Sequence, residues 1–255
     1  MKRVLKYMIL GVILLTAACS RHDALMFGSD SQVSFFRGDD GYGQQDSILH
    51  SFFLESDDTQ ERDTVWVELA LVGFPADEAR PVKIVQTNKD AADAAVAGTH
   101  YVALDDPEVA NQVVIGAGQS VTRIPVILLR DVSLKTEKKR LELTIEENEY
   151  FKPGIDADRN FMVQTTELAE KPGSWDSSWK TYLGEWSSQK MWFVVRYLGL
   201  TDFDETYVTA HKQYLRQKAH AKLNEYNASH DEPLCNNPEK HHEVGEVCKD
   251  CVVFP

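Results

Sequence analysis

Long apolar runs, basic clusters and enzyme motifs are all scarce in this sequence of 255 residues. The longest apolar stretch, residues 7–15, is shorter than the ~20 residues that a transmembrane helix needs. No comparable run follows it, so we expect no membrane-spanning helix. Lysine and arginine cluster only in the mixed stretch 135–140. Phosphate contacts need a basic face, and we therefore expect no nucleic-acid partner.

Short catalytic motifs are also absent. The sequence has no Gly-x-Ser-x-Gly elbow, no phosphate-binding glycine loop and no His-Glu-x-x-His. We therefore expect a protein that is not an enzyme, and assign no catalytic or cofactor-binding residue. A hydrolase whose groups meet only in the fold is the lesser alternative.

The N-terminus has the order of a signal peptide over residues 1–18. A basic head (Lys2, Arg3 and Lys6) precedes the apolar stretch, and small residues lead to Cys19. Cleavage before a cysteine is typical of a lipoprotein, in which Cys19 carries the lipid. Thr16 departs from the usual lipobox, which has Leu, Val or Ile there. The alternative is an ordinary signal peptide with a coincidental cysteine.

The remaining chain is acidic and long enough for a substantial core. Without the signal peptide, 24 basic residues stand against 40 acidic ones, a formal charge of −16. Such a surface keeps a tethered protein soluble. About 237 residues suffice for one large or two ordinary domains. The composition changes near residue 165, which predicts a boundary between residues 19–165 and 166–255.

Residues 19–165 show the period-2 alternation of half-buried strands. In residues 64–72, Val65, Val67, Leu69 and Leu71 share one face, and residues 140–146 alternate in the same way. Further strands are predicted at 32–36, 48–54, 82–86, 112–115, 121–129 and 161–165. Residues 90–97 hint at one helical turn. The spacing predicts a mainly β fold, a β-sandwich.

Four elements follow one another in part of this region: Gly98-Thr99-His100-Tyr101, a strand ending in glycine at 113–118, a long strand closing on Asp131, and the Leu/Glu alternation of 139–146. In this order they resemble the Calx-β repeat of immunoglobulin-like sandwiches. It implies an immunoglobulin-like, Calx-β-like sandwich. Calcium binding in that family uses acidic clusters, but Asp105, Asp106 and Asp131 give no full ligand set. Turn formation is the favoured role for these three residues.

Residues 166–255 are predicted to form a small α+β region after the sandwich. Four of five tryptophans lie in 18 residues (Trp175, Trp179, Trp186 and Trp192). Either they fill the seam between sandwich and tail, which we favour, or they form a glycan platform. Residues 190–199 are predicted to be a strand, and residues 202–229 an amphipathic helix capped by Thr201 or Asp202. His211 is predicted to pack on its apolar side.

The combination resembles a family of uncharacterised surface lipoproteins of Bacteroidetes. It joins the lipoprotein signal and sandwich to Tyr182-Leu183-Gly184-Glu185-Trp186-Ser187, the predicted strand and helix, and the terminal Val252-Val253-Phe254-Pro255. The resemblance implies lipid anchoring at the outer membrane, on its periplasmic or outer face. It also implies a non-catalytic accessory of a TonB-dependent, starch-utilisation-type nutrient uptake system, contacting the transporter, its lid lipoprotein or a glycan. A structural envelope lipoprotein without a ligand is the alternative.

Three cysteines and two histidines follow the predicted helix: Cys235, His241, His242, Cys248 and Cys251. Outside the cytoplasm cysteines usually form disulfides, here Cys235 with Cys248. Three is an odd number, however, and three thiolates with one imidazole complete the tetrahedral set of one structural zinc ion. Both alternatives stay open, and either would have the structural role of holding the C-terminal tail in place.

The lipid anchor is tested by Cys19→Ala. Loss of the thiol should abolish lipid labelling and release the protein from the membrane fraction, because the acyl chains supply the anchoring. Labelling with a radioactive fatty acid and membrane fractionation measure the two effects. Unchanged membrane association of Cys19→Ala would show that the anchor lies elsewhere.

Overall fold

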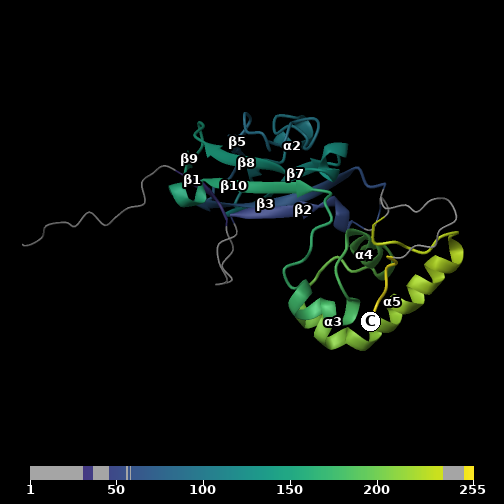
Figure 1. The fold of residues 1–255 in the computed structure, drawn as a ribbon. Coiled ribbons are helices and arrows are strands. Elements are labelled where there is room, and N and C mark those ends of the chain that lie inside the picture. Colours follow the sequence, from purple (N-terminus) through teal and green to yellow (C-terminus); the bar gives the residue numbers. More distant parts are fainter. Residues whose placement is uncertain (1–30, 37–45, 56, 58, 238–249) are drawn as a thin grey trace, which may run out of the picture.

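A computed structural model describes residues 31–36, 46–55, 57, 59–237 and 250–255. The chain forms a β-sandwich and a helical module beside one end of it (Figure 1). The signal peptide and Cys19 lie outside the described residues. Within the described part of the chain, no helix is long and apolar enough to cross a membrane.

Two four-stranded sheets make up the sandwich. The first has the order β7-β3-β1-β9 and the second the order β2-β10-β8-β5, while β4 and β6 form a small separate pair. The strands of the first sheet are β1 (Gln32–Phe35), β3 (Arg62–Val72), β7 (Val121–Leu129) and β9 (Lys152–Pro153). Those of the second are β2 (Ser47–Ser51), β5 (Lys83–Gln86), β8 (Lys139–Glu146) and β10 (Asn160–Thr166). The small pair is β4 (Arg80–Pro81) and β6 (Val114–Ile115).

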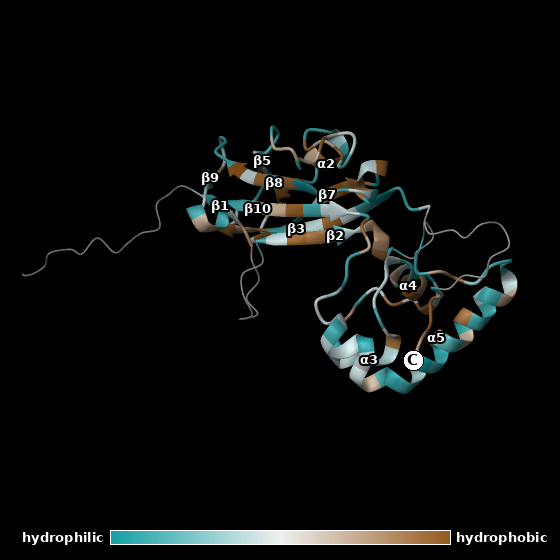
Figure 2. Cartoon of the chain, viewed as in Figure 1, coloured by the Kyte–Doolittle hydropathy of each residue, from teal (hydrophilic) through white to brown (hydrophobic). Residues whose placement is uncertain are grey.

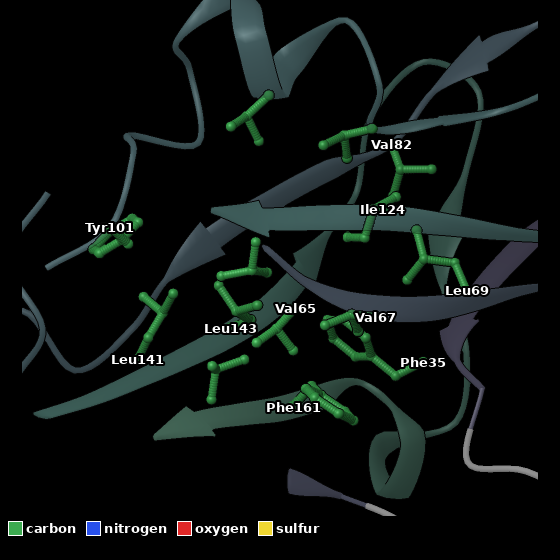
Figure 3. Close-up of a cluster of buried hydrophobic side chains, with 14 of the residues drawn as sticks. Phe35, Val65, Val67, Leu69, Val82, Tyr101, Ile124, Leu141, Leu143 and Phe161 are labelled. Carbon is green, nitrogen blue, oxygen red and sulfur yellow. The ribbon is translucent and has the colours of Figure 1, made fainter. Parts of the chain in front are cut away.

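The predicted alternation builds the sandwich core. Val65, Val67 and Leu69 of β3 face Leu141 and Leu143 of β8 across the space between the sheets (Figure 3). Successive strand residues point to opposite faces, so every second residue enters this core. The mainly β, sandwich fold class predicted from the sequence is confirmed.

The short elements differ from the sequence prediction in three places. The strand predicted over 48–54 ends at Ser51 and continues as the 3-10 turn η1 (Phe52–Leu54). Residues 90–97 form turns and two isolated bridges rather than helix. A short helix α2 (Pro107–Ala110) was not predicted, although Asp106 caps it and proline opens it, which is a favourable start. The turns η2 (Val132–Lys135) and η3 (Asp156–Asp158) complete this part.

The helical module contains five helical segments. They are η4 (Trp175–Trp179), α3 (Lys180–Leu183), α4 (Ser188–Phe193), η5 (Val194–Leu198) and α5 (Glu205–Ser229). The predicted strand over 190–199 is therefore wrong. A continuous apolar run is compatible with a buried strand or a buried helix. Ser187, whose hydroxyl accepts from the Lys190 amide, starts a helix, and Gly199 ends it in the left-handed conformation (φ 70°).

Helix α5 has the predicted amphipathic character but begins later than expected. Its cap is Asp204, whose carboxylate accepts from the amides of Thr206 and Tyr207, and not Thr201 or Asp202. Leu215, Ala219 and Leu223 are buried against the module, while most of α5 is hydrophilic (Figure 2). His211 is exposed and stacks on Tyr207, so its predicted packing on the apolar side is wrong.

A second apolar core fills the helical module. Trp175 and Trp179 are fully buried in it, and their indole nitrogens donate to the carbonyls of Gly184 and Phe203. Val252 and Phe254 return from the C-terminal residues and complete the core. Most of the tryptophan-rich segment thus serves packing, as favoured from the sequence, but inside the helical module rather than in the seam with the sandwich.

Lys190 is the one charged residue buried in this module among the described residues, with 3% of its surface exposed. Its ammonium group lies 5.5 Å from the centre of the Phe254 ring. Burial lowers the pKa of Lys190 from 10.5 to about 8, and Glu185 offsets part of this effect. The folded protein therefore holds this proton less tightly than the unfolded chain does.

The buried lysine predicts a pH dependence of stability. Between about pH 8 and 10.5 the unfolded chain binds more protons at this position, so the free energy of unfolding should rise with pH in that window. Lys190→Met should remove this rise and stabilise the protein at pH 7, by up to roughly 3 kcal/mol. Urea unfolding at several pH values measures both effects. The exposed Lys212→Met is the control, and an identical pH profile for both variants would contradict the assignment.

Candidate functional site

Turn η1 connects the sandwich core to the helical core. Phe52 is fully buried in the sandwich core, whereas Phe53 and Leu54 pack against the core of the helical module. Successive side chains in a 3-10 turn point about 120° apart, which allows neighbouring residues to enter different cores. The two parts of the chain therefore meet along a defined seam.

A partly buried ion pair lies on the sandwich side of this seam. Arg130, just after β7, donates to Glu167, just after β10, at 2.7 Å, and each side chain is 11% exposed. The Arg130 guanidinium also lies 6.0 Å from the centre of the Phe52 ring. The second carboxylate oxygen of Glu167, Oε2, is buried and has no hydrogen-bond partner among the described residues. A buried acceptor without a partner costs free energy unless something binds it.

Arg196 links the helical module to the chain at and just after η1. It extends from η5 and donates to the backbone carbonyls of Phe53 and Glu55. Trp192, four residues earlier and so on the same helical face, contacts Tyr197 and Tyr226 edge to face. These contacts fix the orientation of the Trp192 ring.

These groups line a hollow of about 480 Å³, which we call the seam cleft. Its walls are Phe53, Arg130, Asp131, Val132, Lys135, Glu167, Trp192 and Arg196. Two aromatic rings, three cationic side chains and two carboxylates therefore share one depression. Binding sites for small polar molecules combine apolar surface with a few placed polar groups in this way.

A larger groove of about 670 Å³ lies between β5 and β7. Its walls are mostly apolar, and its buried polar side chains, Gln86 and Tyr101, are already paired. The Tyr101 hydroxyl donates to Gln86 at 2.8 Å, and Gln86 donates to the Ala95 carbonyl at 2.8 Å. The buried polar side chains of this groove are therefore used within the protein, unlike Oε2 of Glu167 in the seam cleft.

The acidic residues named for a calcium site have other roles. Asp106 caps α2, and Asp131 accepts from the amide and hydroxyl of Ser133 at the start of η2. These hydrogen bonds hold the pKa of Asp131 below its usual value. Both are turn-forming roles, in line with the interpretation favoured from the sequence.

Most of the predicted cysteine and histidine site lies outside the described residues, namely His241, His242 and Cys248. Cys235 and Cys251 face each other in an isolated antiparallel bridge. Cys235 is disulfide-bonded. The amides of Asn236 and Val252 donate to the carbonyls of Asp250 and Leu234, which holds the tail against the segment after α5.

The seam cleft was not predicted from the sequence. Its members come from residues 53, 130–135, 167 and 192–196, and only the fold brings them together. Trp192 was the one signal, as part of the tryptophan-rich segment.

Several solved structures are similar to this chain over about half of its length. A two-domain protein of unknown function from Bacteroides fragilis is 11% identical, with a TM-score of 0.34, over 55% of this chain and 46% of that one. The CBD12 region of CALX1.2 is 13% identical, with a TM-score of 0.34, over 53% and 44%. A proposed carbohydrate-binding protein from Bacteroides ovatus is 14% identical, with a TM-score of 0.32, over 54% and 37%. The match thus spans less than half the length of each of these proteins.

None of the curated proteins matches the chain significantly. One family model does match, over residues 27–200, which include the sandwich and the helical segments up to η5. Helix α5 and the C-terminal tail follow the matched region. The chain belongs to the family described as domain of unknown function DUF4843.

Proposed function

We propose that this protein is a non-catalytic, lipid-anchored binding protein of the cell envelope that holds a glycan in the seam cleft. The observation that carries the proposal is the position of Glu167 Oε2, a buried acceptor without a described partner, in the same cleft as Trp192. A sugar hydroxyl is a suitable donor for this oxygen, and the apolar face of a sugar ring stacks on an aromatic side chain. Arg130, Lys135 and Arg196 favour a sugar that carries carboxylates.

The envelope location rests on the signal peptide and Cys19. The partner system rests on the family resemblance, which points to a TonB-dependent transporter and its lid lipoprotein. In such a system the protein would hold a glycan near the transporter. Genes for a transporter and lid lipoprotein beside this gene would support the uptake role, and their consistent absence across related genomes would count against it.

Glycan binding in the seam cleft is tested by Trp192→Ala. Calorimetric titration with neutral and uronic-acid-containing oligosaccharides should show binding to the native protein. The substitution should weaken it about tenfold or more, since buried aromatic anchors commonly contribute on the order of 1–2 kcal/mol or more. The matched control is Trp66→Ala, because Trp66 is 51% exposed on β3 and lies outside the cleft.

The two variants separate the possible outcomes. Binding that is lost in Trp192→Ala and kept in Trp66→Ala supports the seam cleft. Equal affinity for the native protein and Trp192→Ala, or no binding of any oligosaccharide in the panel, contradicts the proposal.

A further inference from the structure

The space between the sheets becomes polar at the end nearest η1. In β2, Ile48 packs against the sandwich core, and His50 lies two residues further along the same face. In β3, Val65 belongs to the core, and Asp63 lies two residues before it on the same face. The two opposed sheets therefore each direct a metal-binding type of side chain into the same space.

Glu55, directly after η1, lies close to these two residues. One possible ligand atom from each of His50, Glu55 and Asp63 lies within 4.8 Å of the other two. The His50 Nδ1 atom is 3.5 Å from Asp63 Oδ2, while Asp63 Oδ1 accepts from the Thr64 amide at 2.7 Å. This amide bond orients the carboxylate so that its other oxygen faces the imidazole.

The surroundings hold polar groups whose hydrogen bonds are unmet. The His50 side chain is 11% exposed, and its Nε2 atom is buried without a hydrogen-bond partner among the described residues. Thr165, the register partner of His50 in β10, is 1% exposed, and its hydroxyl likewise has no partner there. Phe52 meets the His50 ring edge to face at 4.7 Å and fixes its orientation.

We propose that His50, Glu55 and Asp63 bind a divalent transition-metal ion of the zinc class. An imidazole with two carboxylates is a ligand set for zinc and its neighbours, whereas magnesium and calcium prefer oxygen ligands alone. Zinc–ligand distances of ~2.0–2.2 Å place tetrahedral ligand atoms about 3.4 Å apart, close to the separation of His50 and Asp63. Glu55 reaches the ion by a small side-chain movement, and water takes the fourth position.

Such an ion would also stabilise the seam between the sandwich and the helical module. The Glu55 carbonyl accepts from Arg196, so a metal ion on the Glu55 side chain would fix the same residue that the helical module holds. Binding to the folded state alone raises stability, so zinc should raise the melting temperature of the full-length protein. This inference is independent of the glycan proposal.

The experiment uses cobalt(II) as a spectroscopic substitute for zinc in full-length protein freed of metal. Nitrogen and oxygen ligands give d–d absorption bands without the thiolate charge-transfer band that the cysteines of the tail would produce. We expect such a spectrum, and expect it to persist in Cys248→Ser. Asp63→Asn and Glu55→Gln, which keep side-chain size, should each weaken cobalt affinity by about 100-fold or more, which exceeds the usual effect of losing a group that only orients a ligand.

The exposed His211→Ala is the matched control and should bind cobalt as the native protein does. Far-ultraviolet circular dichroism of each metal-free variant checks that the fold is intact. A thiolate spectrum alone, no cobalt or zinc binding, or unchanged affinity in both folded carboxylate variants would overturn the proposal.

Discussion

The structure depends on one short turn whose side chains enter two different cores. Phe52 belongs to the sandwich and Phe53 to the helical module, and the carbonyls of Phe53 and Glu55 are held by Arg196. Apolar burial on both sides fixes the turn, and the fully buried Phe52 alone contributes roughly 1.5–3 kcal/mol. The seam cleft and the His50 cluster both lie next to this turn. Their geometry therefore follows from the same packing.

The sequence predicted the sandwich well because its strands obey a local rule. A strand with one buried face alternates apolar and polar residues, and β3 and β8 were placed almost completely from that pattern. The helical module was harder to predict. The run from Met191 to Leu198 is apolar at every position except Arg196, and five of its eight residues are buried, which hides the periodicity that separates helix from strand.

The functional residues could not be predicted from the sequence for a different reason. Arg130 and Glu167 are 37 residues apart, and Arg196 bonds carbonyls more than 140 residues away. No local sequence pattern reveals such long-range contacts, which depend on how the sheets and the helical module pack. His50 and Asp63 illustrate the same limit, because the alternation shows that each faces inward but not that they face each other. The sequence did locate Trp192, although it did not separate this residue from the buried Trp175 and Trp179.

Val252 and Phe254 are buried in the helical core. The two cores therefore become complete at different times during synthesis of the chain. Every strand of the sandwich lies before residue 167, so that core can close while the rest of the chain is still emerging. The helical core needs residue 254 and stays open until the chain reaches that point. A chain shortened by a few residues would thus pair a finished sandwich with a module that exposes Phe193, whose ring packs against Phe254. Exposed apolar surface of this kind favours aggregation, so Val252 and Phe254 protect the module as well as completing its core.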